Sequence, residues 1–503
     1  MADTTTREGT RPIALAPLDE RPVSTGLVED VAAIAGAALE VAPAKCLPSF
    51  RTPGDTSGLA RWLTQKAADG SDLVVSIDML AHGGLIAART DDVDLGELIR
   101  RLGLLRSIRH AHPDITITGV AIVMRATDSY SNVEEPDYWS RYGRELHALG
   151  ASVHAGTSHS DDSAARSIPA EIRADFAHRR LRNHVLDLAA LDLAWENVFD
   201  TLVITSDDTA PLSAGSAEQE MLAHWQTLAA VRPVLVYPGA DETGAVMVAR
   251  LLAGRAGAQP RISVFPGDPA GLDLVPSFEN VPLQESVRRQ AEAAGAVLVA
   301  RNDGADLCLV IHTPDPGRRD MFGGMPDPDA ADAIAGTVTA LERALETGKP
   351  VVLADLRYTN GGDLALVTEL ARRGLLDELA SYGGWNTAGN ALGGVVASGV
   401  AYIAGRALGT LDTEAVDRAC ERRLLDDVVY QSHLRREVTQ RFGGRISPVE
   451  DDLVAAAEDW LTAELPHAAS EIGITLTSDI AEVTLPWRRS FEVGIRFDSE
   501  DPR

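Results

Sequence analysis

Short apolar runs rich in β-branched residues alternate with amphipathic stretches along nearly the whole chain. Such runs occupy residues 12–18, 72–77, 115–124 and 201–205, and a polar turn and then a helical pattern, as at 95–110, follow them. Strands separated by helices of this length are joined by crossovers, which make the strands parallel and bury the sheet. The sequence therefore predicts an α/β fold with a mostly parallel sheet.

The order of these patterns predicts three parts. An N-terminal α/β part, barrel-like or doubly wound, spans residues 11–265, and a polar, aromatic insertion at 128–182 within it is interpreted as a lid or wall. A second α/β part spans 266–448, after a segment rich in Pro, Gly and Asp. A C-terminal extension at 449–503 has the pattern of one helix and a β-hairpin. We expect an active cleft between the two α/β parts, at the C-terminal ends of their strands.

The composition argues against several classes of protein. The chain has 46 Lys and Arg against 74 Asp and Glu, a formal net charge of −28, which disfavours binding to nucleic acids and to membrane surfaces. Its three cysteines lie far apart and form neither a zinc motif nor a disulfide framework. The N-terminus is polar, and no apolar run reaches the roughly 18 residues of a spanning helix. We expect a cytoplasmic protein without nucleic-acid or membrane partners, and a homo-oligomer is compatible with the sequence.

Motifs for nucleotide cofactors are absent from the sequence. No GxxxxGK[ST] occurs, and no GxGxxG follows the first predicted strand. The HExxH of zinc proteases and the GxSxG of serine hydrolases are also missing. We expect no cofactor, although carboxylates alone could hold a divalent cation.

Polar residues concentrate where the predicted strands end. In parallel α/β folds these ends share one edge, and ligands bind there. A single Asp after a strand can also be the N-cap of the next helix, but Arg, Asn and Trp in the same loops favour a site. The candidates for the acid/base or nucleophile are Asp78, Asp207, Asp208 and Glu242. The candidates for substrate binding are Asp19, Glu20, Arg21, Arg89, Arg125, Asp241, Asp355, Arg357, Asn360, Asp363, Trp385, Asn386, Asn390 and Trp487.

These residue types suit a reaction on a sugar. Glycoside hydrolysis needs two carboxyl groups about 5–10 Å apart, one protonated and one ionised, and neighbouring strand ends can supply them. Adjacent side chains leaving a strand point to opposite sides, so at most one of Asp207 and Asp208 needs to face the cleft. Asp, Asn and Arg can bond sugar hydroxyls while Trp385 stacks on the C–H face.

We therefore predict a hydrolase of carbohydrate metabolism, a glycosidase acting on small glycosides by paired carboxylates. Two alternatives remain open on the sequence. One is a sugar-binding or regulatory protein that cleaves no bond. The other is a divalent-metal-dependent isomerase, aldolase or phosphate-ester hydrolase.

The same loops carry a resemblance that extends over residues 11–487. The segments are PLDERPV (17–23), DMLAHGGLIAAR (78–89), SDDTAP (206–211), GADE (239–242), NGGD (360–363) and GWNTAGNALG (384–393). With them the sequence resembles a bacterial domain-of-unknown-function family, number 4127. The resemblance implies a shared fold and a shared site. Since the family name carries no activity, it supports the choice of site residues and leaves the reaction to physical argument.

Overall fold

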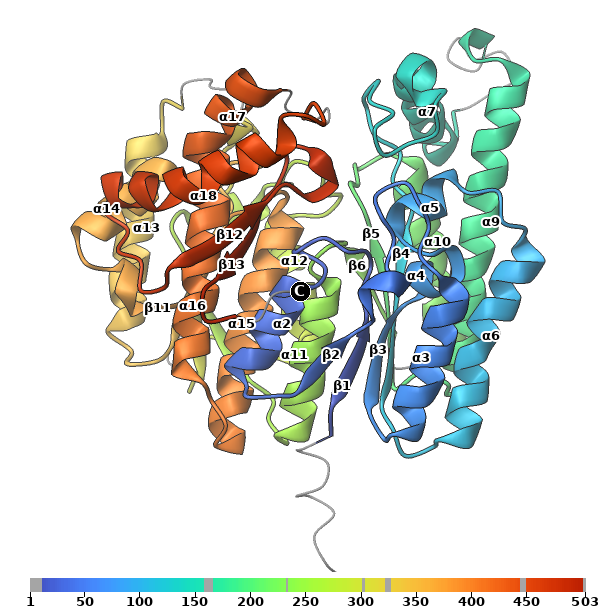
Figure 1. Cartoon of the computed structure of the whole chain (residues 1–503), viewed down its shortest axis with the longest axis horizontal. Coiled ribbons are helices and arrows are strands. Elements are labelled where there is room, and N and C mark those ends of the chain that lie inside the picture. The colour runs from blue at the N-terminus through green and yellow to red at the C-terminus, as the bar shows by residue number, and fades with distance from the viewer. Residues whose placement is uncertain are drawn as a thin grey trace, which may run out of the picture. The chain divides into compact units, whose positions relative to one another are not determined.

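The computed structural model describes residues 11–157, 166–231, 234–300, 304–321, 327–443 and 449–500. Three predicted features lie partly or wholly outside these residues: the polar N-terminus, the middle of the 128–182 insertion and the last residues of the C-terminal extension. The chain forms two compact units, and each contains a parallel sheet with helices packed around it (Figure 1). The prediction of an α/β fold with a second α/β part is confirmed.

The first unit comprises the chain up to residue 20, residues 38–247 and residues 278–280. Its sheet has the order β2-β1-β3-β4-β5-β6, and all neighbouring pairs are parallel. The strands are β1 (Ile13–Ala16), β2 (Leu39–Val41), β3 (Asp72–Ser76), β4 (Ile117–Val123), β5 (Thr201–Ser206) and β6 (Val234–Pro238). β2 and β6 form two separate edges, so the sheet is open and doubly wound, and no barrel is closed. The strand order reverses between β1 and β3, the place where ligands bind in such sheets.

The four inner strands β1, β3, β4 and β5 are buried along their whole length. Helices cover a parallel sheet on both faces, which explains why these strands are continuous apolar runs without alternation. The helical elements of the first unit are η1 (Ala44–Cys46), α3 (Thr56–Ala68), α4 (Ile77–His82), α5 (Leu85–Thr90), α6 (Leu95–Ala111), α7 (Trp139–His154), α9 (Ala170–Trp195), α10 (Ala214–Ala229) and the start of α11 (Thr243–Arg255). The predicted helix at 95–110 is α6.

The predicted insertion at 128–182 contains a loop, α7 and the first half of α9. Trp139, Leu146 and Phe176 form a small hydrophobic core of their own there. Trp139 Nε1 donates a hydrogen bond to Thr127 at 3.1 Å, which ties α7 to the loop after β4. The described part of this segment is therefore packed onto the first unit around a small core of its own.

The second unit comprises residues 21–37, 248–277 and 281 onward. Its sheet has the order β11-β10-β9-β7-β8, again with all pairs parallel. The strands are β7 (Arg261–Pro266), β8 (Val297–Val299), β9 (Leu307–His312), β10 (Val351–Asp355) and β11 (Leu379–Gly383). Counted from β7, this is the order 2-1-3-4-5 that also begins the first sheet, so the two units share a strand order. β7, which the sequence placed at the end of the N-terminal part, pairs with β8 and β9.

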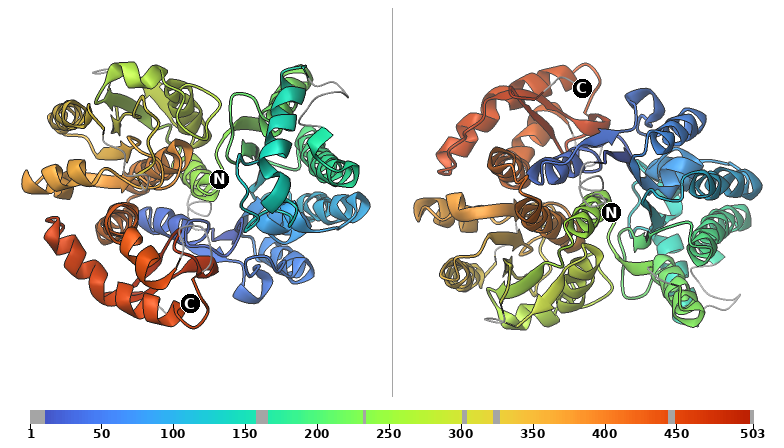
Figure 2. Two further views of the ribbon diagram at one scale, coloured as in Figure 1. Left: turned by 90° about the horizontal axis from the view of Figure 1, so that it is seen from above. Right: turned by 90° about the horizontal axis from the view of Figure 1, so that it is seen from below.

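The second unit is rich in helices and ends in a small antiparallel pair. Its helical elements are α2 (Gly26–Ile34), η2 (Pro269–Asp273), α12 (Leu283–Ala293), α13 (Ala330–Leu345), α14 (Leu364–Arg372), η4 (Leu376–Glu378), α15 (Ala388–Leu408), α16 (Thr413–Leu424), the π-helix η5 (Leu425–Leu434), α17 (Arg435–Phe442), α18 (Val454–Glu471) and η6 (Pro486–Arg488). The antiparallel strands are β12 (Ile480–Thr484) and β13 (Gly494–Phe497). The predicted C-terminal helix and β-hairpin are confirmed as α18 and the β12–β13 pair, which Figure 2 shows from two further sides.

α15 is long and apolar enough to cross a membrane by length and composition, and it is the one such helix among the described residues. However, 72% of its apolar window is buried inside the protein. It packs against β9, β10, β11, α2 and α12. These contacts are those of a core helix that covers a sheet.

Candidate functional site

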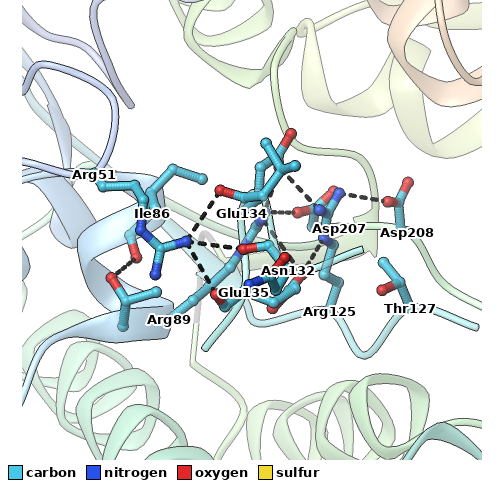
Figure 3. Close-up of polar contacts among 12 residues, drawn as sticks. Arg51, Ile86, Arg89, Arg125, Thr127, Asn132, Glu134, Glu135, Asp207 and Asp208 are labelled. Carbon is cyan, nitrogen blue, oxygen red and sulfur yellow. Dashed lines mark hydrogen bonds and ion pairs between the residues drawn. The ribbon is translucent and has the colours of Figure 1, made fainter. Parts of the chain in front are cut away.

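Six charged side chains meet at the carboxyl ends of three neighbouring strands of the first unit (Figure 3). Parallel strands end at a common edge, so the loops that follow them bring their residues together. The six are Arg89 on α5 after β3, then Arg125, Glu134 and Glu135 after β4, and Asp207 and Asp208 after β5. We call them the carboxylate–arginine cluster.

Arg89 is 1% exposed and binds three carboxylates of the cluster. Its Nη1 donates to Glu134 Oε2 at 2.9 Å and lies 3.7 Å from Glu135 Oε1. Its Nη2 donates to Asp207 Oδ2. Removing a guanidinium from water is costly, and these charged partners compensate for its burial.

Arg125 makes three further bonds to carboxylates, each of 2.8 Å. Nε donates to Glu135, Nη2 to Glu134 and Nη1 to Asp208. Glu134 Oε2 therefore accepts from both arginines. With two arginines and four carboxylates, the cluster has a charge of 2 − 4 = −2 when every group is ionised. This excess of negative charge favours a proton on one carboxyl group.

Asp208 is a carboxyl group of the cluster on which a proton is stabilised. Burial and the neighbouring Asp207 carboxylate raise the pKa of Asp208 to about 7, against the opposing charges of Arg125 and Arg89. Asp208 therefore keeps its proton to a higher pH than an ordinary Asp, which is the condition for a carboxyl group to act as an acid near neutral pH.

The backbone places both acids in the same cluster. Side chains alternate between the two faces only while the chain is extended. Asp208 has φ +38°, so the chain is no longer extended there and both acids can point into the cluster. A non-glycine residue in this region costs about 1–3 kcal/mol, and such strain is concentrated at functional sites. Asp207 therefore bonds to Arg89 while Asp208 bonds to Arg125 (Figure 3).

Asp78, the third predicted catalytic acid, lies within the electrostatic influence of Arg89 of this cluster. It is in the first turn of α4, and its Oδ2 accepts a bond from the backbone N–H of Ile122 at 3.1 Å. Burial raises its pKa to about 6, while His82 and Arg89 act in the opposite direction. Asp187 of α9 is also buried, and burial together with the charge of Asp78 raises the pKa of Asp187 well above its ordinary value. The structure thus gives Asp78 a structural bond to β4 and a second acid nearby.

Glu242, the fourth predicted acid, is fully buried in the turn between β6 and α11. Its Oε2 accepts from the backbone N–H of Ala240 at 3.0 Å. Gly239 at this turn has φ +150°, and a Cβ there would lie 2.2 Å from Glu242 Oε1. The side chain is therefore packed into its own loop, next to the buried Asp241.

The loop after β1 contains the first three predicted binding residues. Asp19 is buried, and Glu20 Oε1 accepts from the backbone N–H of Phe50 at 2.7 Å. Arg21 belongs to the second unit, where its guanidinium lies 4.4 Å from the centre of the Trp487 ring. Arg489 also lies 4.4 Å from the centre of the Trp487 ring, so this predicted binding residue contacts two arginines.

In the second unit, buried polar residues gather at the ends of β9 and β10. Asp355 Oδ2 accepts from the backbone N–H of Asp363 at 2.7 Å and from the Tyr382 hydroxyl at 2.8 Å. Asp363 caps α14 through Oδ1, and its Oδ2 lies 3.3 Å from Nε2 of His312. Burial raises the pKa of Asp355, while His312 acts to lower it. These bonds join the strand ends to the first turn of α14.

The remaining predicted binding residues lie in the loops around this group. Trp385 is 5% exposed and packs edge-on against Phe491, with ring centres 5.9 Å apart. Asn360 and Asn386 both have φ near +60°, and Asn360 N–H donates to the Asn386 carbonyl at 2.9 Å. Arg357 is buried and donates to Asp327. Asn390 lies in the buried first turn of α15.

Two members of the cluster, Glu134 and Glu135, are absent from the sequence-based prediction. They lie nine and ten positions after Arg125, inside the insertion and away from a strand end, so the criterion of position did not select them. Adjacent acids in the same loop as a predicted arginine were the available signal. Among the described residues, no group of three or more His, Cys, Asp or Glu side chains is arranged to hold a metal ion.

Comparison with known proteins identifies a family but no curated relative. Residues 13–496 match the family described as "Protein of unknown function (DUF4127)", which covers nearly the whole chain. The resemblance seen in the sequence is thereby confirmed. No curated protein matches the chain.

Proposed function

Because the chain belongs to a family whose description names no activity, we propose its function from the site: it is a carbohydrate-active hydrolase that cleaves small glycosides. The observation that carries the proposal is the Asp207–Asp208 pair at the end of β5. Asp208 holds a proton near neutral pH because it is partly buried beside the Asp207 carboxylate. Glycoside hydrolysis uses one protonated and one ionised carboxyl group.

In the proposed reaction Asp208 is the general acid. It gives its proton to the glycosidic oxygen as the bond from that oxygen to the anomeric carbon breaks. The Asp207 carboxylate, held by Arg89, stabilises the positive charge that develops on the sugar ring. Water supplies the new hydroxyl group at the anomeric carbon and returns a proton to Asp208.

The charges of the cluster favour neutral or amine-bearing sugars over acidic ones. The terminal nitrogens of Arg89 and Arg125 already bond to carboxylates. A sugar phosphate or a uronic acid would have to displace those carboxylates and would meet the excess negative charge of the cluster. A neutral hydroxyl or a protonated amine meets no such penalty.

The test is hydrolysis of aryl glycosides by the purified protein, with neutral, amine-bearing and acidic sugars in parallel. We expect turnover of a neutral or amino glycoside, and a loss of about 10²–10⁴-fold in kcat for Asp208→Asn. Asp207→Asn should reduce kcat to a similar degree. Asp192→Asn, which changes an exposed acid on α9, is the matched control and should keep the wild-type rate.

The outcomes separate the proposal from its alternatives. Wild-type rates in both variants of the pair would refute the assignment of the catalytic residues. A sugar that raises the melting temperature without any product would indicate a binding protein, since a ligand of the folded state stabilises it without turnover. Activity lost to a chelator and restored by a divalent cation would indicate a metal enzyme.

A further inference from the structure

We propose that Arg51 is a positioning residue, which holds the loop after β4 so that Glu134 and Glu135 engage the two arginines of the cluster. Arg51 lies in the segment between β2 and α3, far in sequence from the residues that it holds. It touches none of the groups assigned to the reaction. Its kinetic consequence rests on the proposed function, whereas its effect on the cluster does not.

One guanidinium nitrogen of Arg51 donates hydrogen bonds to three backbone carbonyls of that loop (Figure 3). Nη1 donates to the carbonyl oxygens of Asn132 at 2.9 Å, Val133 at 3.1 Å and Glu135 at 3.1 Å. The carbonyls flank Glu134, so the bonds define the direction in which both glutamates leave the backbone. A turn bond from Glu135 N–H to Asn132 O, 3.3 Å, closes the same segment.

Arg51 is itself held in place from β1. The turn at 49–52 is closed by backbone bonds between Ser49 and Thr52 in both directions, of 3.0 and 2.9 Å. Phe50 within it has φ +51°, an unfavourable conformation for an aromatic residue that persists only under constraint. The constraint includes the bond from Phe50 N–H to Glu20 Oε1, 2.7 Å. A path of hydrogen bonds therefore runs from the end of β1 through Arg51 to the cluster.

The position of the glutamates controls how Arg125 acts on Asp208. Arg125 gives Nε to Glu135 and Nη2 to Glu134, and only Nη1 to Asp208. The charge of Glu134 raises the pKa of Asp208, together with Asp207, while Arg125 and Arg89 lower it. If the loop moves away, Asp208 loses a negative neighbour and Arg125 is free to pair with it more closely. Both changes lower the pKa of Asp208.

The test compares Arg51→Ala and Arg51→Lys with wild type, and uses Arg61→Ala as the control. Arg61 is an exposed residue of α3 whose ion pair with Asp55 spans 3.8 Å. The midpoint of Asp208 is followed by NMR of ¹³C-carboxyl-labelled aspartate, with the Asp208→Asn spectrum as the assignment. We expect Arg51→Ala to lower this midpoint by about one pH unit, and Arg61→Ala to leave it unchanged. Arg51→Lys should stay near wild type, because an ammonium has three donors for the same carbonyls.

The pH dependence of kcat/KM should change in the same direction as the midpoint of Asp208. If the proposed function holds, the limb of the kcat/KM profile that reports Asp208 moves to lower pH in Arg51→Ala and returns in Arg51→Lys. If the midpoint of Asp208 shifts in Arg51→Ala but the wild type hydrolyses no glycoside, the positioning role is supported and the proposed function is refuted. A folded Arg51→Ala that titrates like wild type would overturn the positioning role. If that variant does not fold, Arg51→Gln is judged by the same criterion.

Discussion

Replacing Asp208 by Asn should reduce kcat by about 10²–10⁴-fold and at the same time stabilise the protein. In the folded state Asp208 has a pKa of about 7, raised by burial and by Asp207, whereas an unfolded Asp has its ordinary value near 3.8. Between these two values the folded state holds a proton that the unfolded state has lost. The free energy of unfolding therefore decreases as pH rises through this window. Asn carries no such proton, so the variant escapes this loss.

The magnitude follows from the width of the window. Each pH unit well inside it costs the wild type about 1.36 kcal/mol, and the folded group is half ionised at pH 7, so between pH 5 and pH 7 the advantage of Asp208→Asn should grow by about 2.3 kcal/mol. Above pH 7 it should level off, because the folded carboxyl group then ionises as well. Urea unfolding of both proteins at pH 5, 6, 7 and 8, followed by circular dichroism, measures the difference. Asp192→Asn should show no such trend.

The result that would refute this reasoning is a variant less stable than wild type at pH 8. Asp208 would then be an anion whose bond to Arg125 stabilises the fold, and the cluster would be a structural ion network. A gain in stability with a loss of turnover is instead typical of active sites, where function maintains groups that are unfavourable for folding. The stability measurement thus tests the site without a known substrate.

Three further predictions concern stability and are measured by thermal or urea unfolding. Arg125→Met should lower the free energy of unfolding by about 3–5 kcal/mol, more at pH 8 than at pH 5, because it removes a cation that bonds to three carboxylates; an equal loss at both pH values would contradict this. Gly84→Ala should lower the free energy of unfolding by about 1–3 kcal/mol, because the φ of +126° suits glycine and a Cβ would lie 2.9 Å from the ring of Pro48. Its control is Gly103→Ala on α6, where a Cβ would meet no atom within 4 Å; this variant should raise the free energy of unfolding by about 0.5–1 kcal/mol. Thr337→Val should cost about 1–3 kcal/mol by removing the 2.7 Å partner of the buried histidine at the end of β9, while Thr339→Val on the exposed face of α13 should stay within about 0.5 kcal/mol; equal effects would argue against that bond.

The sequence by itself determined the fold class and most of the edge on which polar residues gather. Continuous apolar strands such as 201–205 can be satisfied only inside a sheet covered on both faces, so their pattern is local information. The polar turn that follows each strand is equally local. For this reason Arg125, Asp207 and Asp208 could be selected from position alone, whereas Arg89, further along the chain on α5, belongs to the segment 78–89 that carries the family resemblance.

Tertiary structure decided which of these residues act together. Glu134 and Glu135 reach the cluster from the middle of an insertion, and Arg51 directs them from another crossover. Conversely, Glu242 follows a strand as predicted, yet its carboxylate closes its own turn. The pKa of Asp208 depends on burial and on the charges of Arg89, Arg125 and Glu134, which come from other segments of the chain. These side chains come close to Asp208 only after the strands have paired, so a local sequence pattern cannot predict their effect on its pKa.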